Sequence, residues 1–460
     1  MKGSILEKLQ KNSRLGRVPM HMPGHKRNPS FAHLAPIGGT LDITEIEGFD
    51  DLNSPDGIFL ESERLAASLW GSAECIYSVN GSSGAILAAV RGVLGNGGRV
   101  LMSRGCHRSV YHALELTRSE AVYLKTDLTA FGFSSSVSTD EVEEKLRLYP
   151  DVKLVIITSP TYEGVISDVR AIADICHRRG VPLMVDEAHG AHLGLYGIFS
   201  DGAVKCGADI VVQSIHKTLP SLTQTALLHL SGELVPYGEI KRQMTIFQTS
   251  SPSYILSASI DGAVKFLASA EGERCLREWY DAVMMIRDRL SILQNAYVFD
   301  GLYDVYDLDV SKIVLRGGAE LASILRENNV EPEMVSKYYT VAMTGAGDTP
   351  ETLDALARAA EAADEKIYTY GTNIPMGRTH IPTCKMSIAE AVLLPGEYCK
   401  GYEAVGKISA RYVYAYPPGI PICVPGEVID HITVTEALVL KAAGIDLRGM
   451  EDNCFRVVKE

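Results

Sequence analysis

The chain has 460 residues, of which 46% are hydrophobic and 22% are charged, a composition typical of a soluble globular protein with two or three domains. Its 57 Asp and Glu residues outnumber its 44 Lys and Arg residues. The resulting net charge of −13 argues against a nucleic-acid-binding surface and leaves room for a cationic substrate. No apolar run approaches the roughly 18 residues needed to cross a bilayer, so we expect no membrane partner.

The cysteines and the N-terminal segment indicate the cellular compartment. The nine cysteines are scattered, odd in number and never spaced as a CxxC pair. This pattern is typical of reduced thiols and argues against a disulfide framework or a zinc knuckle. Residues 1–17 mix charged and apolar residues and contain no hydrophobic core of a signal peptide. We therefore expect a cytoplasmic protein.

Short apolar runs rich in β-branched residues alternate with helical patterns in the first half of the chain. The runs are ECIYSVNGSSG, GRVLMSRGCH, EAVYLKT, VKLVIITSPTYEG, VPLMVDEAHG and ADIVVQSIHK. Because they are apolar throughout rather than alternating, they predict strands that are buried on both faces. Strand–helix–strand repetition of this kind predicts a mostly parallel α/β sheet.

Three segments between these runs fit helices. SSGAILAAVRGVL follows the first run directly. STDEVEEKLRLY begins with Ser138 and has Glu141 three residues later, which is the spacing of a capping box. VRAIADICHRRG ends in basic residues and a glycine, as is typical of a helix C-terminus.

Polar clusters follow five of the predicted strands. They are NGSSG (80–84), RGCHRS (104–109), SPTYEG (159–164), DEAHGAH (186–192) and SIHK (214–217). In parallel α/β sheets, ligands bind beyond the carboxyl ends of the strands. The five clusters therefore predict one binding site along one edge of the sheet.

The pattern changes beyond residue 255. Residues 257–295 predict one long helix or two in succession, and residues 310–370 predict a small α+β domain. The prolines of residues 412–429 predict irregular or edge structure. The predicted division of the chain is an N-terminal arm (1–60), a large domain (61–290), a small α+β domain (291–372) and a C-terminal domain (373–460).

Lys217 and Asp186 are the residues with the clearest chemical meaning. Lys217 follows a buried strand beside Ser214 and His216, and a lysine in a partly desolvated, cationic setting has a lowered pKa and can form a Schiff base. Asp186 ends the apolar run VPLMV, where a carboxylate needs a positive partner. Each residue alone also fits an ordinary role, as a solvated flank or a helix cap. Together they fit pyridoxal phosphate (PLP), whose aldehyde binds lysine and whose protonated ring nitrogen pairs with aspartate.

Other polar residues of the clusters have weaker signals. Ser82 and Ser83 lie at the start of a predicted helix, where hydroxyl and backbone N–H groups could hold a phosphate, although such a turn is most often only a turn. The chain has no GxxxxGK[ST] motif and no GxGxxG after a strand, so nucleotide phosphates fit less well. His107 could stack on an aromatic ring or be an ordinary loop histidine. His189 and His192 lack further ligands at helical spacing, so we expect no metal site.

Several segments of the chain together resemble the bacterial ornithine/lysine/arginine decarboxylases of the aspartate-aminotransferase fold. The similarity is greatest to their short form, which lacks an N-terminal wing, and it extends in order over nearly the whole chain. The segments are HMPGHK (21–26), EIEGFDDLNSPDG (45–57), NGSSGAI (80–86), DEAHGAH (186–192), QSIHK (213–217) and YPPGIPICVPGE (416–427). The resemblance implies PLP fold type I, with a large domain built on a mostly parallel sheet, a small α+β domain and a C-terminal decarboxylase-type domain.

The resemblance also implies a role for each site residue. Lys217, Asp186 and His107 would be catalytic: Lys217 would bind PLP covalently, Asp186 would pair with the pyridinium nitrogen and His107 would stack on the ring. Ala188 would pack against the other face of the ring. The residues that would hold the phosphate are Ser82, Ser83, Ser214 and His216.

The implied activity is PLP-dependent decarboxylation of a basic L-amino acid in polyamine biosynthesis. Arginine to agmatine is favoured over lysine to cadaverine or ornithine to putrescine. An aminotransferase or another PLP lyase on the same fold stays open, because the sequence does not say whether Arg411 or Arg456 enters the site. A catalytically inactive regulator is disfavoured by the intact Lys217 and Asp186.

Two further expectations concern the substrate and the assembly. Carboxylates for the distal cation of the substrate are available in the acidic segment 42–57 and at Glu427. Arg411 stands where the family usually has an acidic residue, and LLPGEYCKGYEAVG (393–406) also departs from the family pattern. TSSPSY (249–254) matches a segment that reaches the phosphate of the neighbouring subunit in this fold, which implies a homodimer or a larger homo-oligomer.

Overall fold

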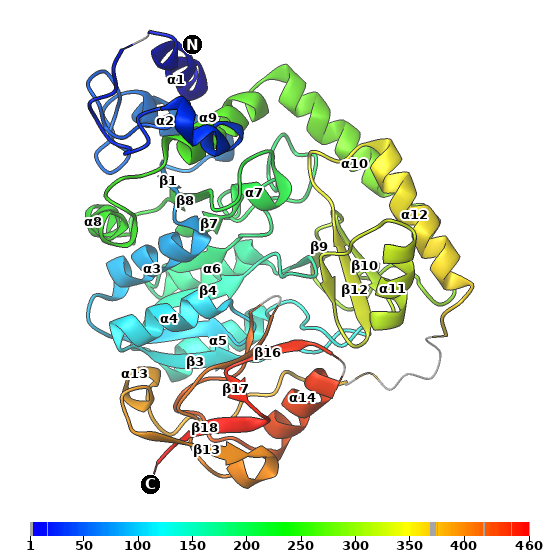
Figure 1. Ribbon diagram of the computed structural model, residues 1–460. Coiled ribbons are helices and arrows are strands. Elements are labelled where there is room, and N and C mark those ends of the chain that lie inside the picture. Colours follow the sequence, from blue (N-terminus) through cyan, green and yellow to red (C-terminus); the bar gives the residue numbers. More distant parts are fainter. Residues whose placement is uncertain are drawn as a thin grey trace.

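The computed structural model describes residues 3–15, 17–368, 374, 376–416, 419–442 and 444–459. A central sheet with flanking helices forms the body of the molecule (Figure 1). The N-terminal segment lies at one end of this body, a smaller α+β region lies beside it, and the C-terminal region lies at the opposite end from the N-terminal segment.

The central sheet has seven strands in the order β1-β8-β7-β6-β4-β2-β3. Strands β7, β6, β4, β2 and β3 are parallel to one another, whereas β8 is antiparallel to both β1 and β7. All six predicted runs contain a strand, and only β8 was missed. The strands are β1 (Glu74–Ser78), β2 (Arg99–Ser103), β3 (Glu120–Leu124), β4 (Val152–Thr158), β6 (Leu183–Asp186), β7 (Ile210–Gln213) and β8 (Ala226–Leu230).

The sheet is buried on both faces, as the sequence predicts. In β4, Leu154 and Ile156 pack in the cluster beneath α3 (Gly81–Leu94) and α4 (Arg108–Thr117). The intervening residues Val155 and Ile157 pack in a second cluster on the opposite face. Strands β2, β6 and β7 divide their side chains between the two clusters in the same way. The period of two along a strand thus carries apolar residues to both faces.

Helices cover both faces of the sheet. On one face, α8 (Tyr237–Phe247) packs with α3 and α4, and on the other α5 (Thr139–Leu148) packs with α6 (Val169–Arg178). At the start of α5, Ser138 Oγ accepts the Glu141 N–H at 3.4 Å. The Glu141 carboxylate lies 3.0 Å from Arg378 Nη2, so the predicted capping box is reduced to a single serine cap.

The N-terminal segment contains α1 (Ile5–Ser13), the 3-10 helix η1 (Pro29–Ile37) and α2 (Ile58–Trp70). The helix α1 is attached to the body because Asp261 Oδ2 accepts the N–H of Ile5 at 2.8 Å. The predicted boundary at residue 60 falls inside α2, and the division into four segments stays a prediction.

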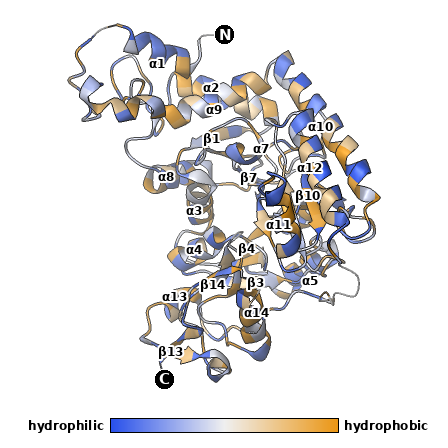
Figure 2. Ribbon diagram, turned by 45° about the vertical axis from the view of Figure 1, so that its right-hand side comes forward, coloured by the Kyte–Doolittle hydropathy of each residue, from blue (hydrophilic) through white to orange (hydrophobic). Residues whose placement is uncertain are grey.

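Two successive helices, rather than one, lead to the α+β region. They are α9 (Tyr254–Leu267) and α10 (Ala270–Ser291), and Ser269 caps the second of them. Buried residues of α10 recur every three or four positions, and hydrophobic and hydrophilic residues accordingly share this helix (Figure 2). The α+β region that follows contains β9 (Asp307–Leu308), which pairs with β5 (Val165–Ile166), then β10 (Lys312–Arg316), α11 (Ala319–Glu327), β11 (Met334–Val335), β12 (Tyr339–Met343) and α12 (Pro350–Asp364).

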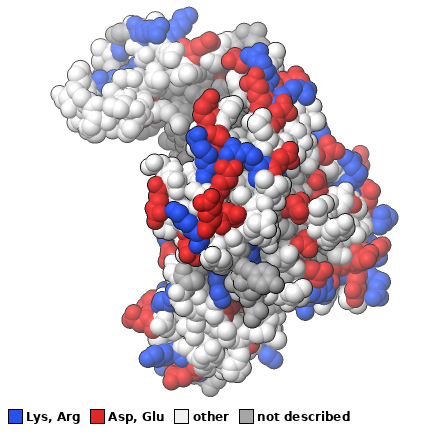
Figure 3. Space-filling model, turned by 90° about the vertical axis from the view of Figure 1, so that its right-hand side faces the viewer, with Lys and Arg blue, Asp and Glu red and all other residues white. Residues whose placement is uncertain are grey.

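Charged side chains of both signs are interspersed over the face that carries α10 and α12 (Figure 3). Arg289 on α10, for example, lies 2.6 Å from Asp354 and 2.8 Å from Glu361 on α12. This face of the molecule shows no continuous basic patch.

The C-terminal region has two three-stranded sheets, β13-β18-β17 and β15-β14-β16. The proline-rich segment was predicted to be irregular or at an edge. Pro421 does lie in the edge strand β15, but the proline-free residues 413–416 form the middle strand β14, and residues 417 and 418 lie outside the described residues. The elements are α13 (Ile388–Ala391), β13 (Gly396–Lys400), the 3-10 helix η2 (Gly401–Ala404), β14 (Val413–Tyr416), β15 (Pro421–Cys423), α14 (His431–Ala442), β16 (Asp446–Arg448), β17 (Met450–Glu451) and β18 (Cys454–Val458).

All nine cysteines are free thiols, and four of them are buried. Within the described ranges, no helix is both long enough and apolar enough to cross a membrane.

Candidate active site

The five polar clusters follow strands whose carboxyl ends lie at one edge of the central sheet. Strands β2, β4, β6 and β7 are parallel, and β1 runs in the same direction because β8 is antiparallel to both β1 and β7. Ser214 Oγ, after β7, donates a hydrogen bond to Ser82 Oγ, after β1, at 2.9 Å. The clusters after two separate strands therefore meet, as the sequence predicts.

Lys217 lies in the short helix α7 (Ile215–Thr218), directly after β7. Its Nζ atom is 2.8 Å from Nε2 of His189. Burial lowers the pKa of Lys217, and the charge of Asp186 opposes this shift. A lysine amine with a lowered pKa is the form that can attack an aldehyde.

His189 and Lys217 share this hydrogen bond, and Nε2 is the acceptor when the Lys217 side chain is the donor. Burial, and then the positive charge of Lys217, lower the pKa of His189 well below its usual value, so the ring is neutral. When Nε2 accepts, Nδ1 carries the ring proton. Nδ1 is buried and has no hydrogen-bond partner among the described residues, which leaves a donor available for a ligand.

Asp186 is the last residue of β6 and is only 3% exposed. Its Oδ1 atom accepts the N–H of Ala188 at 3.2 Å. Burial raises the pKa of Asp186, whereas the charge of Lys217 lowers it. A buried carboxylate in this position requires a cationic partner to stay ionised.

His107 is the N-cap of α4, and its Nδ1 atom accepts the N–H of Ser109 at 3.3 Å. Burial, with a contribution from the charge of Lys217, lowers the pKa of His107 to about 3. The ring is therefore neutral at physiological pH and held in a fixed orientation by its own helix.

The first turn of α3 has no side-chain cap. Asn80, at its N-cap position, donates its amide to the carbonyl of Phe247 at 2.8 Å instead. Ser82 is half-buried and Ser83 is exposed in this turn. His216, half-buried beside Lys217, has its Nδ1 atom 2.8 Å from the carbonyl oxygen of Thr225. The first turn of α3 thus offers backbone N–H groups and hydroxyls to an anion.

These residues fit PLP on the chemistry of their donors and acceptors. The buried carboxylate of Asp186 suits a protonated ring nitrogen, the uncapped turn of α3 suits a phosphate, and the Lys217 amine suits an aldehyde. Among the described residues, no group of three or more His, Cys, Asp and Glu side chains is arranged to hold a metal ion.

Comparison with known proteins decides the family. Residues 4–306 match the family described as Orn/Lys/Arg decarboxylase, major domain, and residues 382–445 match its C-terminal domain. The chain belongs to the Orn/Lys/Arg decarboxylase family. The predicted family and the predicted class of reaction, decarboxylation of a basic amino acid, are thereby confirmed.

Individual relatives agree with this assignment. The chain is 31% identical to the arginine decarboxylase of Bacillus subtilis over 98% of this chain and 97% of that protein. It is 30% identical to the arginine decarboxylase of Halalkalibacterium halodurans over 96% of this chain and 94% of that protein. The lysine decarboxylase of Francisella novicida superimposes with a TM-score of 0.84 at 18% identity, over 99% of this chain and 81% of that chain. This likeness confirms the predicted fold class.

Two further residues near His189 and Lys217, Tyr162 and Glu333, were not singled out from the sequence. The ring of Tyr162 lies 4.6 Å from that of His189, between ring centroids, and its hydroxyl donates a hydrogen bond to the Glu333 carboxylate. The negative charge of Glu333 acts on Lys217 and raises its pKa against the effect of burial. Tyr162 belongs to a predicted cluster, but nothing in the local sequence distinguishes Glu333, which lies between α11 and β11.

Glu427 does not have the exposure that a carboxylate for the substrate requires. It is 0% exposed, and its Oε2 atom lies 3.1 Å from Nη2 of Arg104 and accepts the N–H of Val424 at 2.9 Å. Asp50, in the acidic segment, is likewise engaged, since its carboxylate accepts backbone N–H groups of its own segment, those of Gly57 and Phe59 among them. These two candidates therefore have structural roles.

The two arginines that the sequence left open belong to the C-terminal region. Arg411 lies 2.8 Å from Glu451 of β17, and Arg456 is part of β18. Figure 1 shows these strands at the opposite end of the molecule from α7. Within one chain, neither arginine lies at the strand edge that holds Lys217.

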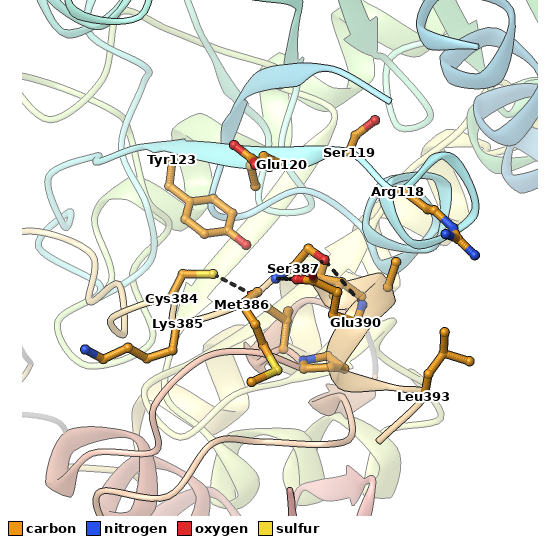
Figure 4. A pocket seen from close by; sticks show the side chains of 15 residues that line it. Arg118, Ser119, Glu120, Tyr123, Cys384, Lys385, Met386, Ser387, Glu390 and Leu393 are labelled. Carbon is orange, nitrogen blue, oxygen red and sulfur yellow. Dashed lines mark hydrogen bonds between the residues drawn. The ribbon is translucent and has the colours of Figure 1, made fainter. Parts of the chain in front are cut away.

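A cavity of about 560 Å³ lies elsewhere, between β3 and the segment around α13 (Figure 4). Tyr123, Cys384 and Ser387 are among its lining residues. None of the predicted site residues lines this cavity, so it is separate from the site.

Proposed function

We propose that this member of the Orn/Lys/Arg decarboxylase family binds PLP through Lys217 and decarboxylates a basic L-amino acid. The observation that carries the proposal is the placement of Lys217, whose Nζ atom contacts His189 and whose pKa is raised by the charge of Asp186 against the effect of burial. The amine and the carboxylate belong to neighbouring strand ends, β7 and β6.

Each residue of the site has a distinct task. When bound, PLP supplies a ring that accepts the electron pair released by the departing carboxylate. Asp186 would keep the proton on the ring nitrogen, and His107 and Ala188 would hold the ring. The phosphate would be held by Ser82, Ser83, Ser214 and His216.

Lys217 and His189 are placed to manage protons. The 2.8 Å contact joins Nζ to Nε2, so a proton can be held between these two atoms. Burial of both groups limits exchange of this proton with water.

We further propose that the distal cation of the substrate meets Glu333, which carries the hydrogen bond from Tyr162. Glu333 is exposed and acts on Lys217, so it combines access to a ligand with proximity to the site. A carboxylate binds a guanidinium group through two hydrogen bonds and an ammonium as a point charge. The two arginine decarboxylases to which the chain is similar support arginine, with agmatine as the product.

The functional unit that we propose is a homodimer or a larger homo-oligomer. Residues 249–251 are exposed at the turn between α8 and α9, where the family resemblance expects a contact with the neighbouring phosphate. In the N-terminal segment, Val18 and Met20 are 78% and 87% exposed, which is unusual for large apolar side chains. Sedimentation equilibrium should give at least twice the monomer mass, and a fully active monomer would contradict this part of the proposal.

The assignment of Lys217 is tested by its covalent bond to the cofactor. Purified protein with PLP should absorb visible light, and borohydride reduction followed by peptide mapping should place the label on Lys217. A label on another lysine, such as Lys26, would refute the assignment. A colourless protein would refute the binding of PLP.

A further inference from the structure

A completely buried lysine lies behind the site, in the α+β region. Lys312, the first residue of β10, is 0% exposed. Its ammonium group has three acceptors, Asp309 Oδ2 at 2.7 Å, the carbonyl oxygen of His189 at 3.0 Å and Ser311 Oγ at 3.1 Å. All three of its protons can be used, which is the condition under which a buried ammonium group is tolerated.

Asp309 extends this contact to the helix of Lys217. Its Oδ1 atom lies 3.1 Å from Nε2 of His192, and Nδ1 of His192 lies 3.2 Å from Oγ1 of Thr218. Burial lowers the pKa of His192, so the ring is neutral, donates to Asp309 and accepts from Thr218. Thr218 directly follows Lys217, and its carbonyl oxygen accepts the N–H of Ala346 at 2.9 Å.

The loop that carries His189 is confined from the other side as well. A Cβ atom on Gly190 would lie 2.5 Å from Cδ of Pro160 and 2.9 Å from Cγ of Glu187. The backbone at Gly190 is therefore packed so closely against Pro160 that a side chain would not fit. The carbonyl oxygen of His189 accepts a hydrogen bond from Lys312 on one side, and Pro160 packs against the next residue, Gly190, on the other.

We propose that Lys312 and Asp309 form a positioning pair, which holds His189 against Lys217 and ties the α+β region to the site. Lys312 acts through the carbonyl of His189, and Asp309 acts through His192 and Thr218. The pair touches neither of the atoms that would react. The proposal deepens the proposed function, on which it rests for the role of Lys217.

The charges that surround Lys217 allow the effect of the Lys312–Asp309 pair to be measured as a change in the pKa of Lys217. Burial lowers the pKa of Lys217, Asp186 and Glu333 raise it, and Lys312 lowers it further. Three histidines also lie within the influence of the Lys217 charge, His189, His107 and His216, and because burial lowers their pKa values these rings are neutral. Lys312 is thus the buried cation whose removal should raise the pKa of the Lys217 amine.

The test measures the reactivity of Lys217 in variants of the pair. The double variant Lys312→Met/Asp309→Asn keeps the side-chain volumes and removes both charges together, whereas Lys312→Met alone would leave Asp309 buried and unpaired. Protein without added cofactor is labelled with traces of acetic anhydride across a pH range, and peptide mass spectrometry gives the midpoint for Lys217. We expect the midpoint to rise by about half a pH unit, because the charge of Lys312 acts more strongly on Lys217 than the opposite charge of Asp309 does.

A second variant keeps the test decisive if the double variant does not fold. Asp309→Asn alone retains the charge of Lys312 and removes its counter-charge, so the midpoint of Lys217 should fall. Shifts of opposite sign in the two variants are not expected of a pair that only stabilises the fold. An unchanged midpoint in a variant that unfolds at a measurable temperature would overturn the proposal.

The control is a buried ion pair at a different place. Glu427→Gln breaks the contact with Arg104 and should lower the unfolding temperature without moving the midpoint of Lys217. An equal shift in this control would also overturn the proposal, because the effect would then be general. Since the labelling needs no cofactor, a wild-type protein that stays colourless with PLP would refute the proposed function separately.

Discussion

The amine of Lys217 lies 2.8 Å from the imidazole of His189, whose pKa is lowered so that the ring is neutral. This contact joins the end of β7 to the loop after β6. It places a nucleophile and a neutral proton acceptor side by side at the edge of a parallel sheet, where ligands of such folds bind.

Lys217→Ala should abolish catalysis, because both the covalent attachment of the cofactor and a proton carrier are lost. We expect turnover to fall by about three orders of magnitude or more. Release of CO2 from labelled substrate measures this directly. Lys153→Ala, at an exposed position of β4, is the matched control and should retain the activity of the wild type.

Asp186→Asn should matter through charge rather than shape. Asparagine has nearly the same volume but does not stabilise a protonated ring nitrogen, so kcat should fall strongly while PLP stays bound. Absorbance in the visible range shows whether the cofactor is retained. A kcat within about tenfold of wild type, equivalent to about 1.4 kcal/mol, would mean that another group pairs with the nitrogen.

Glu333→Gln should weaken substrate binding more than it slows the reaction. Loss of a charged hydrogen-bond acceptor for the distal cation should raise KM by roughly tenfold to a hundredfold, with a smaller effect on kcat. Glu331→Gln is a close control, since Glu331 is paired with Arg326 on the surface. Steady-state kinetics that show the same change in both variants would exclude Glu333 as the specific contact.

Glu187 should make stability depend on pH. It is 1% exposed, and burial raises its pKa from 4.5 to about 8. Between pH 4.5 and about 8, the folded state therefore keeps a proton on Glu187 that the unfolded state releases. The contribution of this proton to the free energy of unfolding is present below pH 4.5 and is lost as the pH rises to about 8. In Glu187→Gln, the decline of the unfolding temperature over this range should become shallower. An identical pH profile in wild type and variant would show that Glu187 is ionised in the folded protein.

The elements of the sheet were largely predictable because their signal is local. The strands β2, β4, β6 and β7 each contain at least three consecutive apolar residues, and each is followed by polar residues. The strand β8 was missed because the run Ala226–Leu230 follows a hydroxyl-rich loop, and only the four-residue helix α7 separates it from β7. Short apolar runs of this kind do not reveal their type through periodicity.

The site was predictable where residues lie at strand ends and unpredictable where partners come from distant segments. Ser82 and Ser214 meet because the sheet brings their strands together. Lys312 occurs in a strand pattern in which a lysine normally indicates an exposed position, and its burial depends on Asp309 and on the carbonyl of His189. Glu427 appeared available as a charge at the end of a loop, yet its pairing with Arg104 is visible only in three dimensions.

The central claim is decarboxylation of a basic amino acid, and one measurement tests it most directly. Purified protein with PLP is incubated separately with L-arginine, L-lysine and L-ornithine, and CO2 and the amine product are both quantified. The account predicts equal amounts of CO2 and amine, with agmatine from arginine formed fastest and no product from Lys217→Ala. Absence of CO2 from all three substrates, with a keto acid formed when an amino acceptor is added, would contradict it.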